Sequence, residues 1–185
     1  GRTWSVSAER GYWRETGNLL FHIALVGVLI TVGIGGGFSY TGQKVVVEGT
    51  TFVNSLLDYS SINRGRFVSD EALQPYAMTL DSFDVTYVPL GEAGGGQAAN
   101  FSANVSVRDV DGSEWDGSVK VNHPLRVGGD QIYLLGNGYA PTITVRDAAG
   151  SVLFSQPVPF LPQDNDYTST GAVKVTGAQP DQLGL

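Results

Sequence analysis

The sequence predicts a mainly β protein, in which an N-terminal transmembrane helix precedes an all-β, antiparallel, sandwich-like extracytoplasmic domain. The first observation is an apolar run from Leu19 to Tyr40 that contains no Asp, Glu, Lys or Arg. As a helix this run would be roughly 33 Å long, enough to cross a hydrocarbon core of about 30 Å. The second observation is that short β-branched or aromatic runs, bounded by turn residues, follow it, a pattern typical of strands.

These observations divide the chain into a cytoplasmic flank at 1–17, a transmembrane helix at 18–40 and an extracytoplasmic β-rich domain at 41–185. The chain has 11 Lys and Arg against 18 Asp and Glu, and the flank holds three of the arginines but only two of the acids. Because basic residues near a span are retained in the cytoplasm, we expect the flank inside and the acidic remainder outside. The chain begins with Gly1 rather than Met, so we expect a piece of a larger protein.

The expected strands can be placed from the alternating runs, and their connections from the turn residues between them. Asp111-Gly112 and residues 147–150 are each expected to close a hairpin, because Gly accepts the left-handed conformation of a tight turn. Segment 90–100, rich in Gly and Ala, is expected to be a loop, whereas 51–61 is compatible with a short helix. The predicted strands lie at 44–48, 83–88, 100–110, 117–123, 131–136, 142–147 and 151–158.

Composition excludes several classes of function. The acidic β domain argues against nucleic-acid binding, which requires a basic surface. The chain has no cysteine, so it carries no disulfide, thiolate metal ligand or thiol nucleophile. The carboxylates of 109–117 lack the spacing of an EF-hand and are interpreted as a solvated hairpin tip. No catalytic constellation stands out, so we expect a non-catalytic protein.

His22 is the one residue whose position calls for a chemical explanation. It lies near the start of the apolar run and is the only ionisable side chain between Glu15 and Lys44. Three explanations remain: an imidazole that reaches the headgroups, a proton relay, or a ligand of heme iron. A relay usually needs several ionisable groups in the membrane, whereas a heme ligand needs only one neutral imidazole. The other histidine, His123, lies far along the β domain, so a second heme ligand is expected from a partner.

Two further patterns are interpreted structurally. Gly27, Thr31 and Gly35 recur at four-residue spacing, which favours close packing of the helix against other helices. In segment 121–141, the functional interpretation is that His123 and Arg126 contact a heme propionate or a partner. The preferred interpretation is that the segment ends one strand, turns at its Gly-Gly pair and begins the next.

The chain resembles the ResB (also called CcsB) family of cytochrome c biogenesis proteins. The resemblance rests on motifs in a fixed order along essentially the whole chain, with a glycine-containing span between the first and the second. The motifs are SAERGYWRETGNLLFH, VNHPLRVGG, IYLLGNGYAP, TVRDAAG, PFLPQD and STG.

The resemblance implies a membrane component of the cytochrome c synthetase (System II), which brings heme across the membrane and attaches it to apocytochrome c. It implies a ResC/CcsA-type membrane partner, and heme b as a transported, non-covalent cargo. It also implies that the β domain at 41–185 is incomplete at its C-terminus. His22 matches the intramembrane histidine that ligates heme iron, as cofactor-binding residue and metal ligand, together with a histidine of the partner. The external heme ligands belong to the partner, so His123 inherits no role. The matching exterior residues are assigned to structure: Asn122, Pro124, Leu125, Gly129 and Tyr133.

The alternative function, from a different class, is a membrane-anchored β domain that recruits a protein partner and has no heme role. In that case His22 would be incidental. Under the first hypothesis the chain is a heme-handling subunit of a heme lyase complex, located in the cell membrane with residues 41–185 on the extracytoplasmic side.

Overall fold

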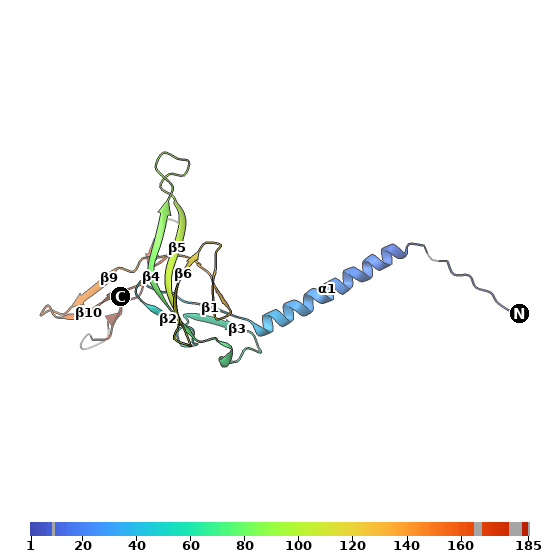
Figure 1. Ribbon diagram of the computed structural model, residues 1–185, viewed down its shortest axis with the longest axis horizontal. Helices are drawn as coiled ribbons and strands as arrows, with labels where there is room; N and C mark the ends of the chain where they lie inside the picture. Colours follow the sequence, from blue (N-terminus) through green and yellow to red (C-terminus); the bar gives the residue numbers. More distant parts are fainter. Residues whose placement is uncertain (9, 165–167, 178–182, 185) are drawn as a thin grey trace. The chain divides into compact units, whose positions relative to one another are not determined.

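A computed structural model describes residues 1–8, 10–164, 168–177 and 183–184. The chain separates into two units, each described by itself. The helix unit comprises Gly1–Gly42 and Ile62–Ala72, and the strand unit comprises Gln43–Ser61 and Leu73–Leu185. An N-terminal apolar helix followed by antiparallel strands confirms the predicted mainly β fold class (Figure 1).

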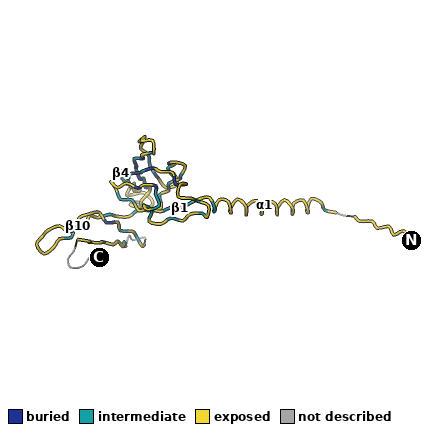
Figure 2. The backbone as a smooth tube through the Cα atoms, turned by 90° about the horizontal axis from the view of Figure 1, so that it is seen from below, coloured by how far each residue is buried: buried dark blue, intermediate teal, exposed yellow. Residues whose placement is uncertain are grey.

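Helix α1 runs from Tyr12 to Phe38 and begins after Gly11, whose φ is 112°. Within the described part of the chain it is the one helix long and apolar enough to cross a membrane. None of its residues is buried, and Figure 2 shows it exposed along its length. The hydroxyl of Thr31 donates to the carbonyl oxygen of Gly27 at 3.0 Å, so this polar side chain is satisfied by the helix itself. The apolar surface of α1 is therefore available to lipid or to other helices.

Short elements follow the helix. β1 (Tyr40–Gln43) pairs with β3 (Ser61–Arg64), and the 3₁₀ helix η1 spans Asp70–Ala72. The predicted strand at 44–48 is wrong, since no strand covers these residues. A turn at 47–50 explains the difference: the backbone N–H of Thr50 donates to the carbonyl oxygen of Val47 at 2.9 Å, and Gly49 has a φ of 78°.

A four-stranded antiparallel sheet is the centre of the strand unit. Its strands, in spatial order, are β2 (Thr51–Val53), β4 (Tyr76–Tyr87), β5 (Ala98–Asp109) and β6 (Glu114–Lys120). The short helix considered for 51–61 is therefore wrong. Residues 51–53 pair instead with residues 77–79 of β4. Their β-branched and aromatic side chains suit a pleated, half-buried surface.

The core lies on one face of this sheet. Alternate residues of β5 are buried while their neighbours are not, as a strand with one covered face requires. Val107 is 1% exposed and Val105 2% exposed, so the centre of β5 is the most enclosed part of the sheet. Figure 2 shows dark, buried segments around β4, the strand that pairs with β5. The buried members of this core are Phe52, Tyr76, Met78, Leu80, Ala103, Val105, Val107, Val119 and Val127.

The predicted hairpins are confirmed. β5 and β6 are antiparallel neighbours, and Gly112 between them has a φ of 82°. β9 (Thr142–Arg146) pairs with β10 (Val152–Pro157), and Gly150 between them has a φ of 87°. The predicted loop at 90–100 is confirmed up to Gln97, because β5 begins at Ala98.

One predicted strand is shifted and another is shorter than expected. β6 covers 114–120 rather than 117–123. β8 (Asp130–Ile132), which pairs with β7 (Leu125–Val127), stops short of 136.

The remaining described strands surround a second, smaller core. β11 (Leu161–Pro162) pairs with β12 (Ser169–Thr170), and β13 (Lys174–Val175) pairs with β14 (Leu183–Gly184). Val158, Val173 and Val175 are buried against side chains of β9 and β10. The described strands thus form one four-stranded sheet and several two-stranded sheets.

Candidate functional site

His22 lies on α1, ten residues after the first residue of the helix. Its Nδ1 is 2.7 Å from the carbonyl oxygen of Asn18, one helical turn earlier. A carbonyl oxygen can only accept a hydrogen bond, so this contact assigns the proton to Nδ1. In a neutral ring the lone pair is then on Nε2, which points away from this hydrogen bond.

Apolar side chains flank the imidazole. Leu19 and Val26 lie one turn before and after it, Ile23 follows it directly, and all three are exposed on the helix surface. The ring of Phe21 meets the imidazole edge to face, with centroids 5.6 Å apart. This surface offers one nitrogen lone pair among hydrocarbon groups.

Such an arrangement fits one axial face of a heme. Iron takes a neutral imidazole nitrogen, and apolar side chains pack well against a porphyrin. A second-sphere hydrogen bond from Nδ1–H to a backbone carbonyl is the usual way in which a ligating imidazole is oriented. Within the described residues, no group of three or more His, Cys, Asp or Glu is placed to hold a metal ion.

The second histidine belongs to the strand unit and has a different setting. His123 lies in a tight turn, where its backbone N–H donates to the carbonyl oxygen of Lys120 at 3.0 Å and Lys120 N–H donates back at 3.2 Å. Its Nδ1 is 3.1 Å from the carbonyl oxygen of Val121. Asn122, at the centre of this turn, has a φ of 60°, the only positive value among the described residues other than glycine.

The rest of the exterior motif also takes turn and strand positions, as its structural interpretation predicts. Gly128 and Gly129 have φ angles of 56° and 93° and connect β7 to β8. A Cβ on Gly128 would lie 3.1 Å from Cβ of Gln74, so this position is also sterically restricted. Arg126 is exposed on β7.

A buried polar cluster, which sequence analysis did not identify, lies beside this turn. Asn54 is 3% exposed, and its amide donates to the carbonyl oxygen of Gln74 at 2.8 Å and to Oδ2 of Asp130 at 2.9 Å. The hydroxyl of Tyr59 donates to Oδ1 of Asn54 at 2.6 Å. The cluster joins the end of β2 to the start of β8. The one signal of this cluster in the sequence was the polar Asn54 directly after the strand 51–53.

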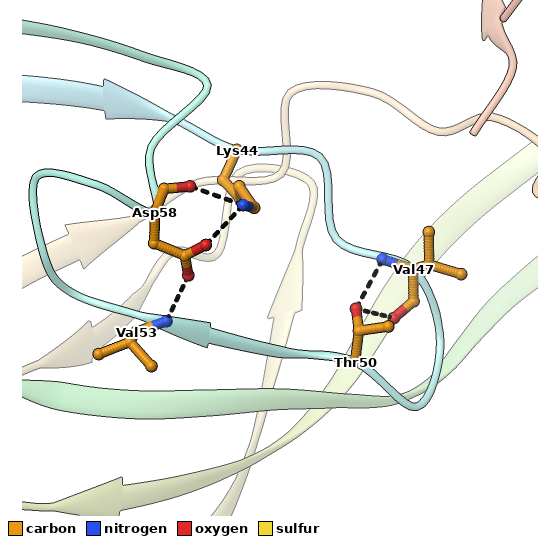
Figure 3. A network of polar contacts seen from close by, with 5 residues as sticks. All are labelled: Lys44, Val47, Thr50, Val53 and Asp58. Atoms are coloured by element: carbon orange, nitrogen blue, oxygen red, sulfur yellow. Dashed lines mark hydrogen bonds and ion pairs between the residues drawn. The ribbon is translucent and has the colours of Figure 1, made fainter. Parts of the chain in front are cut away.

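A second polar network closes the segment between residues 44 and 58 (Figure 3). The ammonium group of Lys44 is 2.6 Å from Oδ1 of Asp58 and 2.6 Å from its carbonyl oxygen, and the other carboxylate oxygen accepts from the N–H of Val53 at 2.7 Å. The hydrogen bond from Lys44 and that from Val53 hold the pKa of Asp58 below its ordinary value, against the opposing effect of partial burial. This network is structural.

Carboxylates also gather on the outer face of the four-stranded sheet, beside an open hollow lined by Asp81, Asn104, Ser106 and Asp116. The hydroxyl of Ser106 donates to Oδ2 of Asp81 at 2.7 Å, and the amide of Asn104 donates to Oδ2 of Asp84 at 2.6 Å. Neighbouring side chains therefore satisfy these acids.

The acids of 109–117 form an exposed hairpin tip, as predicted. There the side chain of Asp111 accepts the N–H of Ser113 at 2.9 Å, and Arg108 pairs with Glu114 at 2.6 Å. Hydrogen bonds from the hydroxyl and backbone of Ser113 lower the pKa of Asp111.

Comparison with protein families matches the ResB-like family over residues 1–185, the whole chain. No curated protein and no solved structure matches the chain significantly. The family match agrees with the order of motifs along the sequence and with the one apolar helix that precedes the strands. The chain therefore belongs to the ResB-like family and is a membrane component of cytochrome c biogenesis.

Proposed function

We propose that this chain handles heme within a cytochrome c synthetase, with His22 as an axial ligand of the iron of the transported heme b. The observation that carries this proposal is the hydrogen bond from Nδ1 of His22 to the carbonyl oxygen of Asn18. It orients the ring and leaves Nε2 as the nitrogen that can donate a lone pair. The family supplies the context, because its members act in cytochrome c biogenesis.

The surroundings of His22 support the same role. Leu19, Ile23 and Val26 place apolar side chains beside the imidazole, and such side chains pack well against a porphyrin. Bound heme iron would supply ligand exchange and redox chemistry, while the chain itself contributes position and ligand. Partners in this proposal are a ResC/CcsA-type protein, which supplies the opposite axial histidine, and apocytochrome c, which receives the heme.

The two histidines provide a matched pair of variants. In the full-length protein purified with its partner, His22→Ala should lose the bis-histidine Soret signature and most of the capacity to mature cytochrome c. Added imidazole should partly restore both, because it fills the vacant axial position. His123→Ala should keep the wild-type spectrum.

Unchanged heme content in His22→Ala would contradict the heme role. It would favour the alternative of a β domain that only recruits a protein partner.

A further inference from the structure

Segment Ile62–Ala72, called here the interface segment, belongs to the same unit as α1 although it follows the helix by more than 20 residues. It packs against the C-terminal end of α1 through backbone contacts. The N–H of Phe67 donates to the carbonyl oxygen of Gly37 at 2.9 Å, and the N–H of Gly65 donates to the carbonyl oxygen of Ser39 at 2.8 Å. The first of these bonds satisfies one of the carbonyls that a helix end leaves unpaired.

Glycine at position 65 is required by this contact. A Cβ on Gly65 would overlap the carbonyl oxygens of Gly36 and Gly37, which are backbone atoms and cannot yield. A Cβ on Gly36, by contrast, would meet nothing within 4 Å. The interface segment is therefore fitted to the end of α1 at one particular point.

Two aromatic rings lie at this junction. Phe38, the last residue of α1, and Phe67 stack with ring centroids 5.0 Å apart. They are 65% and 63% exposed, so each leaves a large apolar surface without a covering side chain. A stacked, exposed pair is a costly arrangement in water and a favourable one in the interfacial region of a bilayer.

The length of the apolar helix places this pair at a definite depth. Residues Leu19 to Phe38 rise about 30 Å, which matches the hydrocarbon thickness of a bilayer. If α1 crosses a membrane, Phe38 lies at the boundary between hydrocarbon and headgroups, and the stack holds Phe67 at the same level.

The charged side chains of the interface segment differ in whether they have a partner within the chain. Arg64 forms an ion pair with Asp70, and the carboxylate of Glu71 is bound by the hydroxyl of Ser69, which lowers its pKa. Arg66 is exposed and has no ion pair or hydrogen bond through its side chain to another described residue. It directly precedes Phe67, so its guanidinium is within reach of the layer of lipid phosphates.

We propose that the interface segment is a lipid-binding anchor, in which Phe38 and Phe67 enter the interfacial region and Arg66 binds a phospholipid phosphate. Apolar rings such as those of Phe bury at the boundary between headgroups and acyl chains, and a guanidinium just outside it reaches the phosphates. The anchor would hold the chain that leaves α1 on the membrane surface. The proposal requires that α1 spans a membrane, but it does not depend on heme binding by His22.

The test uses photocrosslinking to lipid in nanodiscs that contain phosphatidylcholine and phosphatidylglycerol. The full chain carries p-benzoylphenylalanine at one position: Phe67, Leu29 in the middle of α1, or Leu57, which is 98% exposed in the strand unit. Mass spectrometry of the products should show phospholipid adducts at positions 67 and 29 and few at 57. Adducts at position 29 but not at 67 would overturn the anchor proposal and still support a membrane-spanning α1. The absence of adducts at both positions would overturn both the anchor and the membrane span.

Two further pairs of variants test the packing of Gly65 on the helix end and the charge of Arg66. Gly65→Ala should reduce the lipid adduct at 67, because the segment can no longer pack on the helix end, whereas Gly36→Ala should leave it unchanged. Arg66→Gln should lower the ratio of phosphatidylglycerol to phosphatidylcholine adducts roughly fivefold, as expected for one cationic side chain near a bilayer surface. Arg146→Gln, in the strand unit, is the charge-matched control. A protein adduct at 67 in native membranes, in place of lipid, would contradict the proposal.

Discussion

The amide of Asn54 donates to Oδ2 of Asp130 at 2.9 Å, across 76 residues of sequence. This bond joins the end of β2 to the first residue of β8, next to the Gly128-Gly129 turn. The residues of the exterior motif are thereby tied to the central sheet through a buried polar side chain. The stability of that motif consequently depends on a residue outside it.

Asn54→Ala should destabilise the strand unit by about 1–3 kcal/mol, because it removes three hydrogen bonds that this buried side chain makes. Chemical unfolding of the detergent-solubilised chain, followed by near-ultraviolet circular dichroism, measures the loss. Gln156→Ala, at an exposed position of β10, serves as the control and should unfold at the wild-type midpoint. Equal midpoints for all three proteins would show that the cluster contributes nothing.

Asp58 should make stability depend on pH in a definite direction. The bonds from Lys44 and Val53 lower its pKa in the folded chain. Its contribution to the free energy of unfolding is therefore complete above the pKa of an unfolded Asp, about 3.9. The contribution is lost as the pH falls through the lower, folded pKa.

The stability difference between wild type and Asp58→Asn should therefore be constant above about pH 5 and shrink below pH 4. Unfolding midpoints measured from pH 3 to pH 7 check this. A difference that grows toward acid would have the wrong sign and exclude the proposed cause.

Val107 lies in β5 and Val110 directly follows this strand, and the two valines differ in exposure. Val107 is 1% exposed in the centre of β5, whereas Val110 is 70% exposed at the hairpin tip. Val107→Ala should cost about 2 kcal/mol from lost burial and the cavity that remains, and Val110→Ala close to zero. Urea titration of both variants tests this contrast, and similar losses would mean that the core is not where the structure places it.

Asn122 distinguishes a structural from a functional role of the exterior motif. Its φ of 60° is tolerated by Asn and Gly but strained for a β-branched residue. Asn122→Gly should keep stability and cytochrome c maturation, while Asn122→Val should lose about 1–3 kcal/mol of stability. Loss of maturation in a stable Asn122→Gly variant would instead indicate that the amide contacts a partner or substrate.

The absence of cysteine from the sequence makes the topology directly testable. Ala149→Cys, at the exposed β9–β10 hairpin tip, should react with a membrane-impermeant maleimide applied to intact cells. Thr3→Cys, in the basic flank, should react only after the membrane is opened. The reverse pattern would place residues 41–185 in the cytoplasm.

Local sequence was sufficient to predict an element wherever the residues that cause it lie within one segment. The apolar run determines α1 because a helix satisfies its backbone internally. The glycines at 112 and 150 determine the hairpins because they adopt the left-handed conformation within the turn itself. The alternating run at 100–110 predicted a strand, which β5 (Ala98–Asp109) confirms, because neighbouring residues of a strand point to opposite faces.

Tertiary structure decided the features for which a segment needs a distant partner. Residues 44–48 have the composition of a strand, but the turn that follows them is tied to β4, because the N–H of Gly49 donates to the carbonyl oxygen of Leu80 at 2.7 Å. Residues 51–53 are in a strand because β4 offers an edge for them to pair with. The burial of Asn54 depends on Asp130, and the need for Gly65 depends on the end of α1. The sequence placed His22 on an apolar helix, whereas the folded backbone shows that its Nδ1 lies 2.7 Å from the carbonyl oxygen of Asn18, because the helical turn brings the two residues together.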